Sequence, residues 1–197
     1  MKIKIYTDGS CIGNPGPGGW AAVITGLGDG RTEIKGCDWH TTSGHMETTA
    51  VLGSLKTVAM LATKPESLDI TIYTDAQYVA NHIETRNIED FTMSDRYKNS
   101  DLWAEIFRLI PIFRSVKAEW VRGHAGQKDN EYVDKLARAE ARKCASEVEV
   151  RRFTFGQLLL DPEAQAVKVY HHSGCRYSLR IIQKYINLYR DRKSKIF

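Results

Sequence analysis

Short runs of apolar and β-branched residues dominate the first part of the chain and predict strands. These runs occupy Ile3–Thr7, Trp20–Thr25 and Thr32–His40. Gly26, Gly28 and Gly30 lie around the connection between the second and third runs and indicate a hairpin. The stretch 9–19 is rich in glycine and proline, so we expect it to be a loop. Residues 1–40 are therefore predicted to form a three-stranded antiparallel meander.

Helical periodicity begins after this meander. Apolar residues recur at helical spacing from Gly44 to Ala62, Thr42 or Ser43 can cap the helix start, and Lys64-Pro65 ends it. The later pattern predicts, in order, a strand, two helices with a perturbation near Pro111, a strand and a helix. These elements occupy Asp69–Thr74, Ala76–Ile83, Asp101–Phe113, Val116–Val121 and Asn130–Ala145. This order predicts an α/β fold whose five-stranded mixed sheet is flanked by helices.

The sequence Ile-Tyr-Thr-Asp occurs twice, ending at Asp8 and at Asp75. The two strands that carry it are separated by a crossover that includes a helix, so they can lie parallel and adjacent. In that case the two carboxylates leave the sheet at one edge, about 5 Å apart. They would repel each other, and a divalent cation between them would remove that cost. The alternatives are two simple turn-forming aspartates, or an internal repeat, which the unmatched flanking sequences do not favour.

Two further acidic residues lie where they can reach the same edge. Glu47 is near the start of the 44–62 helix, beside core-facing Met46, and Asp134 is early in the last helix, beside Val133. A hard cation such as Mg²⁺ requires several oxygen ligands, and two ions require more than two aspartates. Each residue also has an ordinary role: Glu47 can cap or complement a helix N-terminus, and Asp134 can be an exposed helix residue.

Composition places the chain among globular proteins. Its 197 residues are 42% apolar and 26% charged, which suits one domain of residues 1–145 with an appendage, and we expect a monomer. No run approaches the roughly 20 apolar residues of a membrane helix, and the N-terminus lacks a signal peptide, so we expect a cytoplasmic protein without membrane contacts. The four cysteines show no metal-binding spacing, so reduced thiols are expected.

Five stretches of the chain strongly resemble type 1 ribonucleases H, in the order of that family. They are YTDGSCIGNPGPGGWAAVI (6–24), HMETTA (45–50), YTDAQYV (73–79), DLW (101–103) and VRGHAGQKDNEYVDKLAR (121–138). The resemblance implies a sheet of three antiparallel strands followed by two parallel ones. It also implies a metal-dependent endonuclease that cleaves the RNA strand of RNA–DNA hybrids. The catalytic carboxylates of the family match Asp8, Glu47, Asp75 and Asp134, and its mobile-loop histidine matches His124.

The resemblance also implies the chemistry of this site. Two Mg²⁺ ions, or Mn²⁺, would activate a water and stabilise the departing 3′-oxygen, leaving 5′-phosphate and 3′-hydroxyl ends. Asp8 would contact both ions, Glu47 and Asp75 would complete one shell, and Asp134 the other. His124 lies in a flexible glycine-flanked segment and would act near Asp134 as a proton shuttle that helps product leave. Its ordinary alternative is a solvated loop histidine.

Hybrid recognition requires contact with the 2′-hydroxyl of the RNA strand. By resemblance six residues would line the hybrid groove: Gly9, Ser10, Cys11, Gly13, Asn14 and Gln77. A purely structural glycine-rich turn is the alternative. The chain departs from the family at Thr42–His45, at Ala76 and over 84–100, where three basic residues are offset by four acidic ones and no tryptophan is present.

Residues 146–197 lie beyond the resemblance and hold ten Lys/Arg against five Asp/Glu. The pattern predicts a strand-like segment at 148–155 and an amphipathic helix at Ser178–Arg192. This basic extension either docks on the body, holds nucleic-acid phosphates in place of the missing basic segment, or serves dimerisation or a protein partner. Two rival functions for the whole chain are an inactive nucleic-acid-binding module and an integrase-like metal nuclease.

Overall fold

A five-stranded mixed sheet forms the centre of the computed structural model, which describes residues 1–28, 30–85 and 98–158. The spatial order of the strands is β3-β2-β1-β4-β5. β1 pairs antiparallel with β2 and β2 with β3, whereas β1–β4 and β4–β5 are parallel pairs. The strands are β1 (Lys2–Cys11), β2 (Gly16–Thr25), β3 (Arg31–Thr41), β4 (Asp69–Thr74) and β5 (Ser115–Trp120). The predicted fold class is thereby confirmed.

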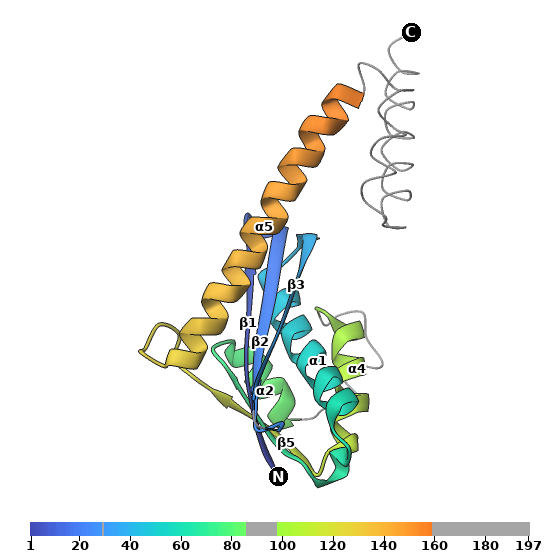
Figure 1. Cartoon of the computed structure of the whole chain (residues 1–197), viewed down its shortest axis with the longest axis vertical. Coiled ribbons are helices and arrows are strands. Elements are labelled where there is room, and N and C mark those ends of the chain that lie inside the picture. The colour runs from blue at the N-terminus through green and yellow to red at the C-terminus, as the bar shows by residue number, and fades with distance from the viewer. Residues whose placement is uncertain (29, 86–97, 159–197) are drawn as a thin grey trace. The chain divides into compact units, whose positions relative to one another are not determined.

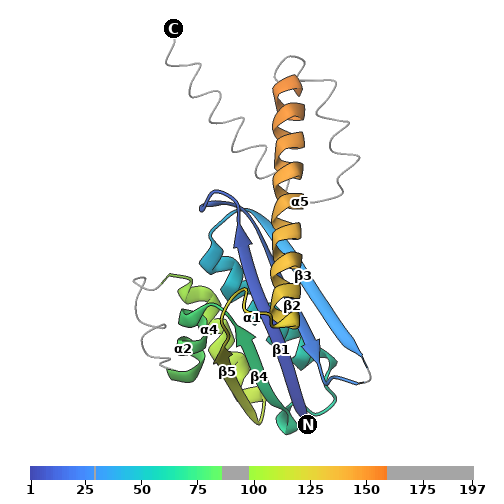
Figure 2. The same ribbon diagram turned by 90° about the vertical axis from the view of Figure 1, so that its left-hand side faces the viewer.

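Helices cover both faces of this sheet (Figure 1). The helices are α1 (Ser43–Leu61), α2 (Gln77–Thr85), α4 (Ser100–Leu109) and α5 (Lys128–Leu158), with short 3-10 turns at Pro65–Ser67 and Ile110–Ile112. The view turned by 90° shows α5 crossing one face and the other three helices behind the sheet (Figure 2). In the described part of the chain, no helix has both the length and the apolar content needed to cross a membrane.

The main hydrophobic core lies between the sheet and α1, α2 and α4. It contains alternate residues of β1, such as Ile3 and Ile5, together with Leu55 of α1 and Trp103 of α4. On the other face α5 buries Val133, Ala137 and Ala141 completely. α1 begins where its sequence predicts, because the Thr42 side chain accepts a hydrogen bond from the His45 amide at 3.2 Å.

The two Ile-Tyr-Thr-Asp segments lie side by side in matching register. Ile5 pairs with Ile72 and Tyr6 with Tyr73 in the parallel β1–β4 ladder, and the two tyrosine rings stack with centroids 4.8 Å apart. Asp8 and Asp75 therefore emerge at the same edge of the sheet, as their sequence context predicts.

Two local predictions are wrong. The loop expected over 9–19 is much shorter, because β1 extends to Cys11 and β2 starts at Gly16, and the two strands pair as far as Cys11 and Gly18. The strand expected at 148–155 is helical, because α5 continues to Leu158. The sequence contains no glycine or proline between Lys128 and Phe155 that would end a helix.

The chain divides into two compact units, Met1–Glu149 and Val150–Phe197. This division lies close to the domain boundary predicted between residues 145 and 146, which remains a prediction. The helix predicted at Ser178–Arg192 lies outside the described residues, as do Cys175 and most of segment 84–100.

Candidate metal centre and active site

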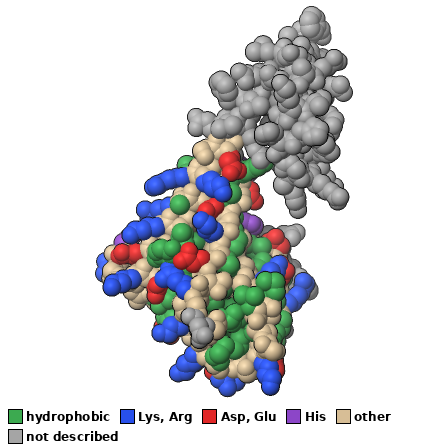
Figure 3. Space-filling view, viewed as in Figure 1, with side chains coloured by type: hydrophobic (Ala, Val, Ile, Leu, Met, Phe, Trp, Pro, Cys, Tyr) green, Lys and Arg blue, Asp and Glu red, His purple; other side chains and the backbone are tan. Residues whose placement is uncertain are grey.

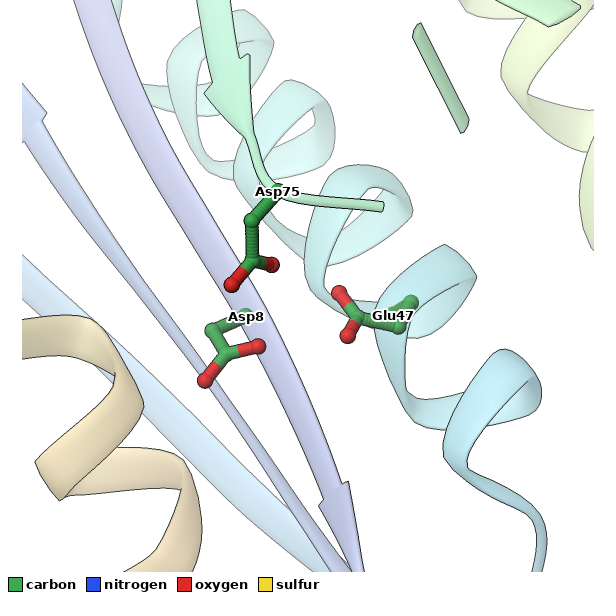
Figure 4. Close-up of side chains that lie close together, drawn as sticks. All are labelled: Asp8, Glu47 and Asp75. Carbon is green, nitrogen blue, oxygen red and sulfur yellow. The ribbon is translucent and has the colours of Figure 1, made fainter. Parts of the chain in front are cut away.

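Three of the four predicted carboxylates converge in one place (Figure 4). Asp8 comes from β1, Glu47 from the beginning of α1, and Asp75 follows the last residue of β4. One carboxylate oxygen from each lies within 4.8 Å of the others. The backbone of Asp75 is fixed at this position because the indole of Trp120 donates a hydrogen bond to its carbonyl at 3.0 Å.

Gly9 allows α1 to approach β1 closely enough for this convergence. A Cβ atom at position 9 would lie 2.2 Å from the Glu47 amide nitrogen and 2.5 Å from the Met46 carbonyl carbon. These contacts are far inside van der Waals distance, and both atoms belong to the backbone of α1, so they cannot rotate away. Only glycine therefore lets the helix place Glu47 beside Asp8.

Two members of the three-carboxylate cluster, Asp8 and Glu47, are buried, and Asp75 is half-buried. Asp8 is 6% exposed and Glu47 8% exposed, and the Oε2 atom of Glu47 is buried without a hydrogen-bond partner. Burial, and next the charge of Asp75, raises the pKa of Asp8 to about 7. Burial, followed by the charges of Asp8 and Asp75, raises the pKa of Glu47 well above its usual range. An orphaned buried oxygen among oxygen donors fits a hard divalent cation.

Asp134 lies near this cluster but outside it. It forms an ion pair with Arg138, one helical turn later in α5, in which Oδ1 of Asp134 is 2.6 Å from Nε of Arg138. The negative charge of Asp134 nevertheless contributes to the raised pKa of Asp8, so the two carboxylates interact electrostatically. The structure thus brings three of the predicted carboxylates together and places the fourth within electrostatic reach.

His124 lies next to Asp134, as predicted. It belongs to the connection between β5 and α5, its φ is 54°, and its side chain is 68% exposed. Its Nδ1 atom is 3.9 Å from Oδ2 of Asp134, and Nη2 of Arg138 is 3.2 Å from its Nε2 atom. One guanidinium therefore contacts both predicted site residues.

Sequence reasoning missed Arg138, although its position four residues after Asp134 on one helix face was a usable signal. We expect Arg138→Gln to reduce kcat about 3- to 10-fold with a smaller effect on KM, because Asp134 and His124 lose their shared positioning contact. Steady-state kinetics on a labelled RNA–DNA hybrid, the substrate that the sequence resemblance implies, would measure this split. Arg142→Gln, one turn further along α5, is the matched control and should leave kcat unchanged. Equal effects of the two substitutions would contradict this role.

Four of the residues expected to contact the hybrid, Ser10, Cys11, Gly13 and Asn14, lie at or beside the tight turn between β1 and β2. Gly13 has a φ of 68°, which favours glycine there. The Cys11 thiol donates to the carbonyl of Thr41 at 3.3 Å, and the Asn14 side-chain oxygen accepts from the Ser43 amide at 3.2 Å. These contacts attach the turn to the end of β3 and the start of α1. Ser10 is the last residue but one of β1, and Gln77 is exposed at the first position of α2.

Comparison with known proteins gives a consistent result. The family model described as RNase H matches residues 1–142. A ribonuclease H of Oleidesulfovibrio alaskensis is 39% identical over 149 residues, covering 71% of this chain and 90% of that protein. One of Rhodopseudomonas palustris strain TIE-1 is 41% identical over 142 residues, covering 69% and 86%.

Solved structures share the fold. The N-terminal RNase H domain of a Mycobacterium tuberculosis protein aligns with a TM-score of 0.61 at 23% identity, covering 75% of this chain and 99% of that one. LC11-RNase H1, solved in complex with an RNA/DNA hybrid, aligns with a TM-score of 0.60 at 20% identity, covering 73% and 99%. With its sheet order, its carboxylate cluster and these matches, the chain belongs to the RNase H family.

Proposed function

We propose that this protein is an endonuclease that hydrolyses the RNA strand of RNA–DNA hybrids with the aid of two divalent metal ions. The observation that carries the proposal is the convergence of Asp8, Glu47 and Asp75, with an unpaired buried oxygen on Glu47. The family match over residues 1–142 supports it. LC11-RNase H1, which shares the fold, was solved with such a hybrid bound.

Each carboxylate has a distinct place in this proposal. Asp8 on the central strand is the candidate shared ligand, Glu47 and Asp75 would hold one ion with it, and Asp134 would hold the other. Bound there, Mg²⁺ or Mn²⁺ would supply the acidity that activates water and the charge that stabilises the departing 3′-oxygen. The products would carry 5′-phosphate and 3′-hydroxyl ends. His124, exposed beside Asp134, can move a proton at its ring nitrogens.

Binding of the hybrid would depend on shape and backbone contacts more than on a basic surface. In the space-filling view Lys and Arg side chains project from α5, and Asp and Glu side chains lie among them (Figure 3). Mixed charge of this kind gives only a weak attraction for phosphates. We propose that Gly9, Ser10, Cys11, Gly13, Asn14 and Gln77 supply the contacts that distinguish RNA from DNA, since several of them meet at one turn beside the carboxylates.

One assay separates this function from its rivals. Labelled RNA–DNA hybrid, double-stranded RNA and double-stranded DNA are incubated with the protein and Mg²⁺, with and without a chelator. We expect cleavage of the RNA strand of the hybrid alone, and none with chelator. Hybrid binding without cleavage would select the inactive binding module. Cleavage or strand transfer on double-stranded DNA would select an integrase-like nuclease.

Metal binding is expected to stabilise the protein more at pH 8 than at pH 6. The pKa of Asp8 is raised to about 7 in the folded protein, so the folded state holds a proton that the unfolded state releases near pH 4. The stability of the metal-free protein therefore falls as pH rises through this window, and a bound cation reverses the loss. Thermal melts with and without Mg²⁺ at constant ionic strength measure the difference. An equal or larger Mg²⁺ shift at pH 6 would contradict it.

We further propose a cytoplasmic monomer with a basic extension, residues 146–197, most of which follows α5 in the sequence. A chain that ends at residue 158, where α5 ends, separates the roles inferred for this extension. Weaker hybrid binding with a shallower salt dependence after deletion would select phosphate binding by residues 159–197. Unchanged affinity and salt dependence would select docking or a protein partner.

A further inference from the structure

Three alternate residues in the first half of β3 contact α5, and we call this line of contacts the seam. Arg31 binds Asp129 at 3.0 Å, and Lys35 binds Glu140 with Nζ 2.8 Å from Oε1. Between them Glu33 lies beside the Tyr132 hydroxyl and raises the pKa of that hydroxyl. Side chains at alternate strand positions share one face of a sheet. The next position of β3 on this face is Cys37.

The geometry of the seam places Cys37 opposite Cys144. From Lys35 to Cys37 is two strand residues, or about 6.8 Å. From Glu140 to Cys144 is four helix residues, or about 6 Å along the axis. Two residues along β3 therefore cover nearly the same distance as one turn of α5. Because Lys35 contacts Glu140, Cys37 is expected opposite the residue one turn after Glu140, which is Cys144. No other described cysteine lies in this seam.

Close packing of α5 on the neighbouring strand supports this placement. Gly19 of β2 pairs directly with Cys37. A Cβ atom on Gly19 would lie 2.4 Å from both the Ala137 carbonyl oxygen and the Ala141 amide nitrogen. The helix backbone thus rests on the sheet beside Cys37, and Cys144 continues the same helix face as Ala137 and Ala141.

The two thiols lie close enough to interact and differ in accessibility. Burial, and then a hydrogen bond with the Cys37 side chain, raises the pKa of the Cys144 thiol to about 12. Cys144 is fully buried, whereas Cys37 is exposed, and both are free. The carboxylate cluster of Asp8, Glu47 and Asp75 is the one potential metal-ligand group among the described residues, so no third ligand joins these thiols. Their arrangement suits a disulfide and not a metal site.

We propose that Cys37 and Cys144 form a reversible disulfide by exchange with a low-molecular-weight disulfide. The exposed Cys37 thiolate attacks one sulfur of the oxidant, which forms a mixed disulfide and releases one small thiol that takes up a proton. Cys144 then gives up its proton and attacks the sulfur of Cys37, which expels the second small thiol. Two protein thiols are oxidised, one small disulfide is reduced to two thiols, and a dithiol reverses the reaction.

The bond would join β3 to α5 across almost the whole catalytic body. Closing so long a loop restricts the unfolded chain, so the oxidised protein should melt about 5–15 °C above the reduced protein. The bond needs little movement, because the seam already aligns the two residues. Neither cysteine belongs to the three-carboxylate cluster, so the disulfide can be tested without measuring nuclease activity.

The experiment treats the full chain with oxidised glutathione, blocks the remaining thiols, and maps the cysteines by mass spectrometry after proteolysis. We expect a linked pair of peptides that contain Cys37 and Cys144, loss of two protein thiols, and the rise in Tm, all reversed by dithiothreitol. A stable glutathione adduct on Cys37 without the link, or a link without a rise in Tm, would overturn the proposal.

Two variants provide matched controls. Cys37→Ser changes an exposed thiol and should fold normally, lose the linked peptides and show no rise in Tm with glutathione. Cys11→Ser removes a thiol outside the seam and should retain both the link and the rise. A rise that persists in Cys37→Ser, or disappears in Cys11→Ser, would also overturn the proposal.

Discussion

Replacing Asp8 by asparagine is expected to lower the rate of RNA-strand hydrolysis by about 10³-fold or more while stabilising the metal-free protein. The activity falls because Asp8 is the central member of the three-carboxylate cluster, and a neutral amide is a poor ligand for a hard cation. The stability rises because Asp8 is buried and its pKa is raised to about 7 by burial and by Asp75. At pH 8 its ionisation is therefore unfavourable in the folded state, by about 1–3 kcal/mol after allowance for relaxation.

The opposite signs of the two effects make this test specific. Single-turnover cleavage of a labelled hybrid and thermal melts in chelator measure them on one sample. Asp101→Asn, at an exposed position in the first turn of α4, is the matched control and should change neither quantity appreciably. A variant that loses activity and also melts at a lower temperature without metal would indicate that Asp8 supports the fold and not a cation site.

The pairing of the strands could be predicted because it follows from repeated local patterns. The two Ile-Tyr-Thr-Asp segments predicted parallel neighbours, and the observed register joins Ile5 to Ile72. Thr42 was available as a helix cap from its residue type alone, and its side chain does cap α1. Each of these signals is contained in a short stretch of residues, so it can be recognised in a single sequence.

The glycines were harder to interpret, because their role depends on residues distant in the sequence. The stretch 9–19 has the composition of a loop, yet most of it is strand. Gly9 and Gly19 are required there because α1 and α5 press against β1 and β2 at these positions. The composition of this stretch shows which positions lack a side chain, but it does not show which helix packs against those positions. The contact of Arg138 with both Asp134 and His124 depended on tertiary structure in the same way.

Replacing Gly9 by alanine should reduce both stability and catalysis through one contact. The added methyl would lie 2.2 Å from the Glu47 amide nitrogen, so α1 or β1 must shift by roughly 1 Å. We expect a loss of about 3 kcal/mol in the free energy of unfolding, as for other overpacked buried sites. A shift of that size also moves Glu47 away from Asp8 and Asp75, and misplacement by 1 Å can cost about 10²-fold in rate.

Urea unfolding and Mg²⁺ titrations of hybrid cleavage, performed well below the melting temperature, measure the two losses. Gly30→Ala is the matched control, because its methyl would meet no atom within 4 Å and should leave both quantities nearly unchanged. If Gly9→Ala destabilises the fold but cleaves with normal rate and metal requirement, Glu47 does not depend on this contact for its position. If both losses appear together, then close packing of α1 on β1 is what holds Glu47 at the metal centre.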